Sequence, residues 1–277
     1  MVVVPEGGQT GGAVANQLLI IASVERTGST LLCSLLRGTH AAGTPIEYLN
    51  IQTRNFARFR ELHGVPQLRH RYRPLGWLRA QTGRFAWRNI GWFDPSSYRQ
   101  YLMAIARANT TSNGVFGIKM HWNQYKRHML DLSLSVDFWN VPVTWVRISR
   151  EDEIRQAISF VRAAQTNSWN SNMEVQREPI YDGLAIVDAL KRIADENADW
   201  SAYFERNNIQ PLNITYEQLT RNMDATVRRV MDHIGVHIDE VPAPQTTRQS
   251  DSINTYWATR FIREFPHFAH RARMPQP

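Results

Sequence analysis

The sequence has little lysine, almost no cysteine and no long hydrophobic run. Of its 32 basic residues, only Lys119, Lys126 and Lys191 are lysines, and the other 29 are arginines. The single cysteine, Cys33, excludes an internal disulfide, and its place in a helical pattern favours a buried side chain over a catalytic thiol. Apolar segments such as 18–22 are too short to cross a bilayer, and no secretory signal is recognisable. These absences predict a soluble protein of the reducing cytoplasm.

The remaining composition is that of one folded α/β domain. With 277 residues and 43% hydrophobic content, the chain can bury a full core. Short apolar, β-branched segments predict strands at 18–22, 115–121, 143–148 and 212–216. Helical patterns predict helices at 151–165, 183–204 and 223–234. This alternation predicts a mostly parallel sheet with helices on both faces, in a domain of residues 16–277 that follows a disordered tail at 1–15.

The most informative motif is the segment 25–30, Glu-Arg-Thr-Gly-Ser-Thr, between the predicted strand 18–22 and a helical pattern of leucines. Such a loop directs backbone N–H groups and the positive end of a helix dipole at one point, so it predicts an anion site. An ATP-binding Walker A loop would carry lysine after Gly28, but Ser29 stands there and Arg26 supplies the nearby cation. A γ-phosphoryl group needs Mg²⁺ and a lysine, whereas a sulfuryl group carries less charge and can move without a metal. The loop therefore favours a nucleotide sulfate donor and no metal.

Further segments follow this loop in a fixed order. They lie at 42–48, 113–124, 150–166, 216–219 and 247–251. Together with residues 26–32, they resemble the bacterial sulfotransferases of the trehalose 2-sulfotransferase family, which use 3'-phosphoadenosine 5'-phosphosulfate (PAPS) as donor. The resemblance runs from about residue 18 to about residue 260. It implies the sulfotransferase fold, a P-loop-type, mostly parallel central sheet flanked by helices.

The resemblance implies two contact regions for PAPS. The 5'-phosphosulfate would be held by Arg26, Thr27, Gly28, Ser29 and Thr30. The 3'-phosphate would be held by Arg150, directly after the predicted strand 143–148, and by Ser159 on the next helix. A late loop would add Arg248, Gln249 and Ser250. The alternative for Arg150 and Arg248 is a solvated surface charge, which is the usual place of an arginine.

The resemblance also implies the catalytic groups. It makes Glu47 the general base, although without the resemblance an exposed loop carboxylate would be the preferred interpretation. His121 is a rival base, because Lys119-Met120-His121 matches a lysine-x-histidine of eukaryotic cytosolic sulfotransferases, and histidine has the better intrinsic pKa for the task. Lys119 fits both patterns and would stabilise the leaving phosphate. Position 44 is acidic in the trehalose enzymes and is threonine here, so an acceptor other than trehalose itself is expected.

An arginine-rich stretch covers residues 51–90. It contains nine arginines and a single acidic residue, Glu61, with aromatic residues between them. By its position it belongs to an acceptor-binding or dimer insertion at about 51–107, and a homodimer is implied by the resemblance. Its charge suggests an anionic acceptor, such as an acidic glycolipid or polysaccharide, or peripheral contact with a membrane. The alternative is a face that is solvated or that contacts another subunit.

Two other functions remain as alternatives to a carbohydrate or glycolipid sulfotransferase. The first is a Mg²⁺-dependent P-loop kinase, which would need a strand ending in a metal-binding aspartate, and none is recognisable. The second is a protein that binds nucleic acid through the arginine-rich and aromatic stretch, with strongly salt-dependent affinity. Neither accounts for Glu47, Lys119 and Arg150 together, so the expected partners are a sugar acceptor and a second copy of the chain, without nucleic acid.

Overall fold

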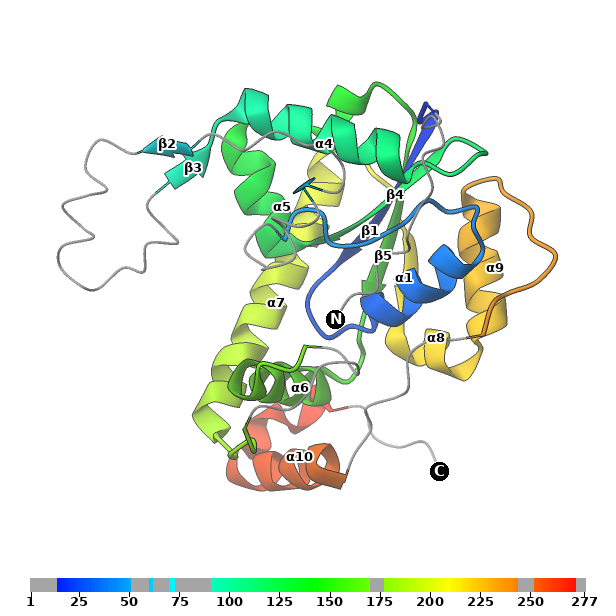
Figure 1. Cartoon of the computed structure of the whole chain (residues 1–277). Helices are drawn as coiled ribbons and strands as arrows, with labels where there is room; N and C mark the ends of the chain where they lie inside the picture. The colour runs from blue at the N-terminus through cyan, green and yellow to red at the C-terminus, as the bar shows by residue number, and fades with distance from the viewer. Residues whose placement is uncertain are drawn as a thin grey trace.

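The computed structural model describes residues 14–50, 60–61, 70–72, 91–169, 177–243 and 252–272 (Figure 1). The strands are β1 (Gln17–Ser23), β2 (His70–Tyr72), β3 (Gly91–Phe93), β4 (Val115–His121), β5 (Val143–Ser149) and β6 (Leu212–Thr215). The α-helices are α1 (Ser29–Gly38), α4 (Pro95–Asn109), α5 (Trp122–His128), α6 (Glu153–Thr166), α7 (Gly183–Arg206), α8 (Tyr216–Arg221), α9 (Met223–His233) and α10 (Ser252–Glu264). Short 3₁₀ helices are η2 (Leu130–Leu132), η3 (Val136–Trp139) and η4 (Pro266–Arg271). The predicted tail at 1–15 and most of the arginine-rich stretch lie outside the described residues.

The central sheet is parallel and has the strand order β4-β1-β5-β6. In the middle strand β1, residues 18–23 are at most 1% exposed, because helices cover both faces of the sheet. Ser23 pairs with His121 on one side and with Ile148 on the other, so three strands end at the same edge. The structure thus confirms the predicted sheet, and its carboxyl edge is where open α/β sheets bind ligands.

Alternate residues of β1 belong to two hydrophobic cores. Leu18 and Ile20 pack in the core that includes buried residues of α4, α5 and α7. Leu19 and Ile21 pack in the core formed with α1 and α9, on the opposite face (Figure 1). Cys33 lies in this second core at 2% exposure, as predicted, and burial raises the pKa of its thiol to about 11.

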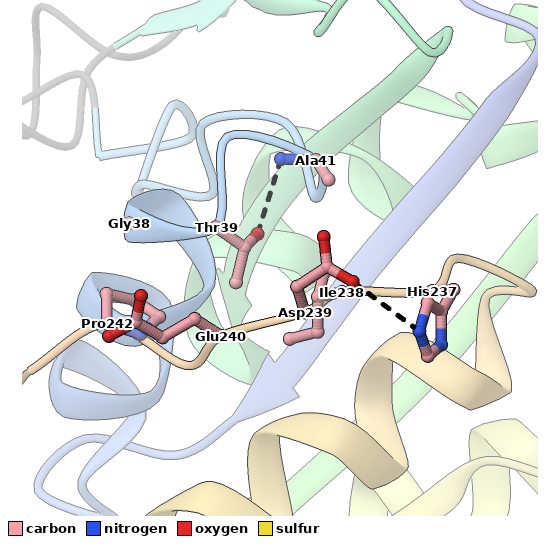
Figure 2. Close-up of a pocket in the computed structure, with 8 residues that line it drawn as sticks. All are labelled: Gly38, Thr39, Ala41, His237, Ile238, Asp239, Glu240 and Pro242. Atoms are coloured by element: carbon pink, nitrogen blue, oxygen red, sulfur yellow. Dashed lines mark hydrogen bonds and ion pairs between the residues drawn. The ribbon is translucent and has the colours of Figure 1, made fainter.

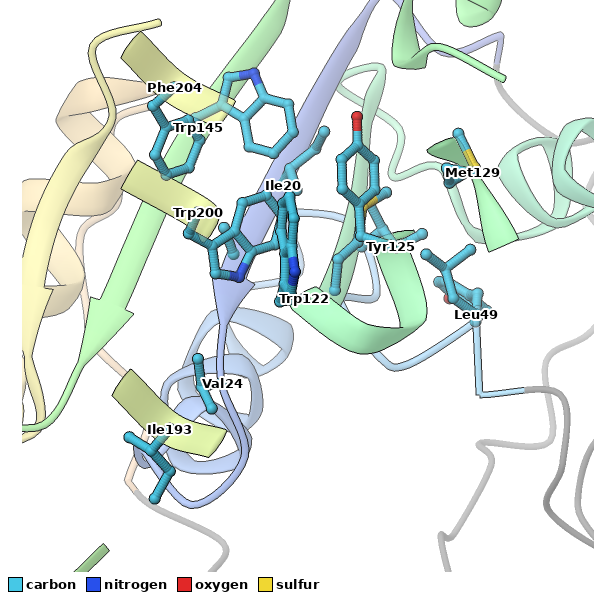
Figure 3. Packing of buried hydrophobic residues seen from close by; sticks show 14 of the residues in the cluster. Ile20, Val24, Leu49, Trp122, Tyr125, Met129, Trp145, Ile193, Trp200 and Phe204 are labelled. Carbon is cyan, nitrogen blue, oxygen red and sulfur yellow. The ribbon is translucent and has the colours of Figure 1, made fainter. Parts of the chain in front are cut away.

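An aromatic cluster in the first core fixes the long helix α7 to the sheet (Figure 3). The Trp200 ring stacks on Tyr125 with a centroid distance of 5.3 Å and meets Trp122 edge-on at 4.9 Å. Rings of this size contribute much of the burial energy of a core. The Trp200 indole also donates a 2.9 Å hydrogen bond to the carbonyl of Ser23. Helix α7 is therefore anchored at the last residue of β1, where the 25–30 loop begins.

The predicted helices are present with small shifts at their ends. Helices α6, α7 and α9 match the predicted 151–165, 183–204 and 223–234 to within two residues. Helix α4 begins inside the segment predicted as an insertion at about 51–107 and ends two residues beyond it, and its Tyr98, Tyr101 and Leu102 are at most 1% exposed. This part of the segment contributes to the core, while the domain boundaries themselves stay a prediction.

Among the helices of the described ranges, none combines the length and the apolar character that a membrane span requires.

Candidate active site

The loop between β1 and α1 is a tight turn with two residues in the left-handed region. Arg26 has φ 66° and Gly28 has φ 81°. A Cβ on Gly28 would overlap the ring of Tyr216, so the turn requires glycine for its conformation and for its space. Thr27 is buried, and its hydroxyl donates to the carbonyl of Val24 at 3.0 Å. Gly28 is the N-cap of α1 and has no side chain to cap the first N–H groups, which suits an anion at the helix N-terminus.

The Arg26 side chain extends from this loop to helix α6. Its Nε donates to Ser159 Oγ of α6 at 2.8 Å. Its backbone carbonyl accepts from Nη1 of Arg150 at 3.4 Å. Burial, followed by the positive charges of Arg150 and Arg162, lowers the pKa of Arg26 to about 10. Three residues that the sequence assigned to the two phosphates of the donor, Arg26, Arg150 and Ser159, therefore lie together.

Arg150 is half-buried and forms no ion pair with a described carboxylate. Its guanidinium lies over the ring of Tyr216, 4.6 Å from the ring centroid. Its Nε is buried and has no hydrogen-bond partner among the described residues, none of which places a carboxylate within ion-pair distance of it. Burial lowers its pKa, although Tyr216, Asp152 and Glu217 act in the opposite direction. A half-buried guanidinium of this kind suits a phosphate, whose oxygens can accept several of its N–H groups.

A second loop, residues 42–48, is fastened to β4 and carries Glu47. Gly43 has φ 70°, and a Cβ there would overlap the backbone of Gly117 in β4. The backbone N–H of Lys119 donates to the carbonyl of Ile46 at 3.0 Å. On the other side, the hydroxyl of Tyr101 donates to the carbonyl of Tyr48 at 2.8 Å. These contacts place Glu47 directly beside the end of β4.

Both oxygens of Glu47 are hydrogen-bonded. Oε1 accepts from Lys119 Nζ at 2.6 Å and lies 3.3 Å from His121 Nε2. Oε2 accepts from Gln124 Nε2 at 2.9 Å and from Asn50 Nδ2 at 3.1 Å. The side chain keeps 26% of its surface exposed, so the carboxylate is held by protein groups and is still accessible.

Lys119 and His121 connect the Glu47 carboxylate to the 25–30 loop and to the end of β1. Lys119 Nζ lies 3.1 Å from Thr30 Oγ1, so a single ammonium group joins Glu47 to the 25–30 loop. The other ring nitrogen of His121, Nδ1, lies 3.0 Å from Ser23 Oγ. Because a carboxylate only accepts hydrogen bonds, His121 Nε2 carries the proton towards Glu47. In a neutral His121, Nδ1 then accepts the hydroxyl proton of Ser23.

The charges around Glu47 determine its ionisation. Burial alone would raise the pKa of this carboxyl, but the positive charge of Lys119, and then that of His121, outweigh burial. The pKa of Glu47 therefore lies well below its usual value. Glu47 is ionised at neutral pH and can accept a proton.

A second ionic cluster lies behind the 25–30 loop. Arg192 of α7 donates to Glu25 Oε1 at 2.7 Å and to Glu196 Oε1 at 2.8 Å. Glu25 Oε1 also accepts from Asn123 Nδ2 at 2.8 Å. Burial and then the charge of Glu25 raise the pKa of Glu196, whereas His121 and Arg192 outweigh burial and lower that of Glu25. The cluster ties the start of the loop to α7.

The structure places most of the predicted site residues around one edge of the sheet. They are Arg26, Thr27, Gly28, Ser29, Thr30, Glu47, Lys119, His121, Arg150 and Ser159. Arg248, Gln249 and Ser250 lie outside the described residues. Sequence reasoning missed the polar neighbours of Glu47 and His121, which are Ser23, Asn50 and Gln124. Gln124 could have been found, because it lies three residues after His121 at the start of a helix and thus on the same side.

A hollow of about 490 Å³ lies elsewhere, at the far end of α1 (Figure 2). Its lining is Gly38, Thr39, Ala41, His237, Ile238, Asp239, Glu240 and Pro242. Asp239 and Glu240 make it a poor place for an anionic donor. It contains none of the predicted site residues. Across the described ranges, no group of three or more histidine, cysteine, aspartate or glutamate side chains is arranged to hold a metal ion.

Comparisons with known proteins identify the family of the chain. Two curated relatives are trehalose 2-sulfotransferases: that of Mycobacterium tuberculosis is 28% identical over 89% of this chain and 95% of its own length. That of Mycolicibacterium smegmatis is 27% identical over 89% of this chain and 94% of its own. Among solved structures, the sulfotransferase domain of the Synechococcus PCC 7002 olefin synthase aligns over 95% of this chain and 90% of its own, with 17% identity and a TM-score of 0.46. The family model of the Stf0 sulphotransferases matches residues 18–264, and the chain belongs to this family of enzymes.

Proposed function

We propose that the protein transfers the sulfuryl group of PAPS to a hydroxyl group of a carbohydrate or glycolipid. The observation that carries the proposal is the position of Lys119, whose ammonium lies between Thr30 of the anion-binding loop and the carboxylate of Glu47. A proton acceptor and a cation thus lie next to the place where an anion is expected. Transfer of a charged group to a hydroxyl requires these three features together.

Arg26 and Arg150 support a donor with more than one phosphate-sized group. The half-buried Arg150 forms no ion pair with a described carboxylate, and its buried Nε has no hydrogen-bond acceptor among these residues, which is unfavourable for a cation. The 3'-phosphate of PAPS fits this position, with Ser159 beside it. The 25–30 loop and the N-terminus of α1 would hold the phosphosulfate. ATP has no 3'-phosphate, so it would leave Arg150 without its anion.

The described residues account for each change in the reaction. The acceptor oxygen forms a new bond to sulfur while the bond between sulfur and the bridging oxygen of the donor breaks. The proton of the acceptor hydroxyl moves to Glu47. Negative charge develops on the leaving phosphate, and Lys119 stabilises it. The products are the sulfate ester and 3',5'-ADP.

His121 would assist Glu47 rather than replace it. Its Nε2 faces Glu47 Oε1, and its Nδ1 faces Ser23, so both ring nitrogens have a partner within the protein. In this arrangement the Nε2 proton of His121 faces Glu47, so His121 orients the carboxylate. The rival assignment, with His121 as the base, would require the ring to turn away from Glu47.

The acceptor class rests on the relatives and on the sequence. The curated relatives are named for trehalose, a disaccharide, which supports a carbohydrate acceptor. The arginine-rich stretch supports an anionic one, but it lies largely outside the described residues. Replacement of Arg69, Arg71 and Arg73 by alanine should lower activity on an acidic sugar more than on a neutral one. Equal losses would argue against an anionic acceptor. The homodimer and membrane contact also stay predictions.

The proposed function is tested first by ligand-induced thermal stabilisation. The ligands are 3',5'-ADP, which is the desulfated product, and ADP with and without Mg²⁺. A ligand at one hundred times its dissociation constant stabilises a protein by about 2.7 kcal/mol. Stabilisation by 3',5'-ADP without metal, followed by transfer of labelled sulfate from PAPS to a sugar, supports the proposal. Stabilisation by ADP with Mg²⁺ alone would indicate a kinase instead.

A further inference from the structure

Gln124 has an amide whose orientation is fixed by Glu47. Its Nε2 donates to Glu47 Oε2 at 2.9 Å. A carboxylate has no proton to give at neutral pH, so the amide nitrogen and not the amide oxygen must face Glu47. The amide oxygen of Gln124, Oε1, therefore points away from the Glu47 carboxylate.

The amide oxygen of Gln124 is buried and lacks a hydrogen-bond donor. None of the described residues donates to Oε1, although the atom is shielded from solvent. A buried carbonyl oxygen without a donor is unfavourable, and native proteins have few of them. The other polar side chains of the same helical turn are already used, since Trp122 donates to Asp199 and Asn123 donates to Glu25. Gln124 Oε1 thus lacks a donor among the described residues, and a ligand hydroxyl or a water can supply one.

The position of this oxygen favours a ligand hydroxyl. Gln124 is hydrogen-bonded to the carboxylate that would take the proton of the reacting hydroxyl, and that hydroxyl must approach Glu47 to hydrogen-bond distance. The two side chains are joined by a hydrogen bond from Gln124 Nε2 to Glu47 Oε2, and Gln124 Oε1 is the other atom of the same amide. A molecule with hydroxyls on adjacent carbons can present one of them to Glu47 and the next to Gln124. A lone hydroxyl could serve only Glu47.

We propose that Gln124 Oε1 accepts a hydrogen bond from the hydroxyl next to the one that becomes sulfated, and so selects acceptors with hydroxyls on adjacent carbons. The inference rests on the proposed function and makes it more specific. Gln124 becomes an acceptor-binding residue, and the reaction at Glu47 is directed to vicinal diols of the kind that sugars carry.

The experiment compares acceptors that differ in a single hydroxyl. Trehalose and the methyl glycosides of glucose, galactose and mannose are the probes, together with benzyl alcohol and cyclohexanol as lone hydroxyls. For each sugar that receives sulfate, the sulfated position is mapped. The analogue that lacks the adjacent hydroxyl is then assayed. The wild-type enzyme should prefer the complete sugar by about tenfold or more in kcat/KM.

The variant Gln124→Met keeps a side chain of similar length and removes the amide. The variant should have a lower kcat/KM for the complete sugar. The ratio of kcat/KM for the complete sugar to that for the deoxy analogue should fall close to one. The matched control is Asn50→Ala, which removes the other hydrogen bond to the same Glu47 oxygen. This control should lower kcat/KM by the same factor for the complete sugar and for the deoxy analogue. The ratio of the two values should stay close to that of the wild type. Stabilisation by 3',5'-ADP shows that both variants are folded and bind the donor product.

Three results would overturn the inference. One is a Gln124→Met enzyme that keeps the wild-type preference for the complete sugar over the deoxy analogue. This result would mean that a water, and not the acceptor, donates to the amide oxygen of Gln124 in the wild type. Another is sulfation of benzyl alcohol or cyclohexanol with none of the sugars. The third is a protein that binds 3',5'-ADP but sulfates nothing in the panel. Absence of 3',5'-ADP binding would instead contradict the proposed function itself, so the two failures can be told apart.

Discussion

The charged side chains on the two sides of the 25–30 loop differ in whether they form ion pairs. On one side, Glu47 and Lys119 neutralise each other, and both oxygens of the carboxylate have hydrogen-bond donors. On the other side, Arg26 and Arg150 lie in contact, and Arg150 has no carboxylate partner within the described ranges. The first side contains a complete ion pair before any ligand binds, whereas on the second side Arg150 forms no ion pair with a described carboxylate and can accommodate an anion.

This difference separates the tasks of the two sides. A complete ion pair positions a reactive group, and it changes little when the substrate arrives. An uncompensated buried cation lowers the stability of the free protein but adds to the affinity for an anion. Substitutions on the Glu47 side should therefore alter catalysis, and substitutions on the Arg150 side should alter donor affinity.

The largest effect is expected for Glu47→Gln. The amide has the shape of the carboxylate but cannot accept the proton of the acceptor hydroxyl, so kcat should fall by about 10² to 10⁴. Binding of 3',5'-ADP, measured by calorimetry, should remain close to that of the wild type. A large loss of 3',5'-ADP affinity with little change in kcat would reverse the roles assigned to the two sides.

Arg150→Met tests the other side. The loss of a charge-assisted contact to phosphate should weaken 3',5'-ADP binding by about 10-fold to 100-fold. The free protein should be at least as stable as the wild type, because a half-buried cation without a carboxylate partner has been replaced by an apolar side chain. Calorimetry and thermal unfolding measure the two quantities.

Arg147→Met is the matched control, since Arg147 lies three residues earlier on β5. Its guanidinium donates to Ser201 Oγ at 2.9 Å and to the carbonyl of Asn197 at 3.1 Å. This substitution should lower stability and leave 3',5'-ADP affinity unchanged. If both variants weaken binding equally, the effect belongs to β5 as a whole and not to the uncompensated cation.

A smaller effect on activity is expected for His121→Gln. Glutamine can still donate a proton to Glu47 Oε1 from the position of Nε2, so kcat should fall by no more than about tenfold. Because Glu47 has a pKa well below its usual value, activity should stay independent of pH down to the acidic range. Loss of activity as large as that of Glu47→Gln, with an acid limb in the wild-type profile where histidines titrate, would identify His121 as the base.

The fold was largely predictable from the sequence because its signals are local. The apolar segment at 18–22 indicates a strand buried on both faces, and the leucine pattern after Gly28 indicates a helix. The position of Glu47 is different, because it depends on Gly43 packing against Gly117 and on the backbone bond between Lys119 and Ile46. These contacts join segments about 70 residues apart in the sequence. The resemblance to a family supplied Glu47, where the local pattern indicated only a loop carboxylate.

Most polar contacts of the site could not be predicted for the same reason. Arg192 reaches Glu25 across 167 positions of sequence, and its helical pattern reveals only that it lies near the polar face of α7. Ser159 was assigned to the 3'-phosphate, and the structure places its hydroxyl on Arg26 Nε. Which donor meets which acceptor depends on the packing of α6 and α7 against the sheet, and side-chain spacing along one helix contains no such information.

The smallest effect is expected behind the loop, for Glu196→Gln. Burial and the charge of Glu25 raise the pKa of Glu196, so its contribution to stability is present below the usual carboxyl pKa and is lost as the pH rises through the raised value. Glutamine does not ionise, and its amide N–H₂ replaces Oε2, a buried oxygen without a donor among the described residues. The variant should be about 1 kcal/mol more stable than the wild type at neutral pH. The difference in the free energy of unfolding between this variant and the wild type should become smaller as the pH falls towards 4.

Chemical denaturation at both pH values measures this difference, and Arg192→Met is its control. Removal of Arg192 leaves the buried Glu196 and the half-buried Glu25 without their shared cation, so it should destabilise the protein by about 1 to 3 kcal/mol. If Glu196→Gln were instead less stable at neutral pH, Glu196 would be ionised and held by Arg192. The cluster behind the loop would then be electrostatically complete in the same way as the Glu47 side. Among the residues described, Arg150 would remain a cation beside the loop that forms no ion pair with a carboxylate.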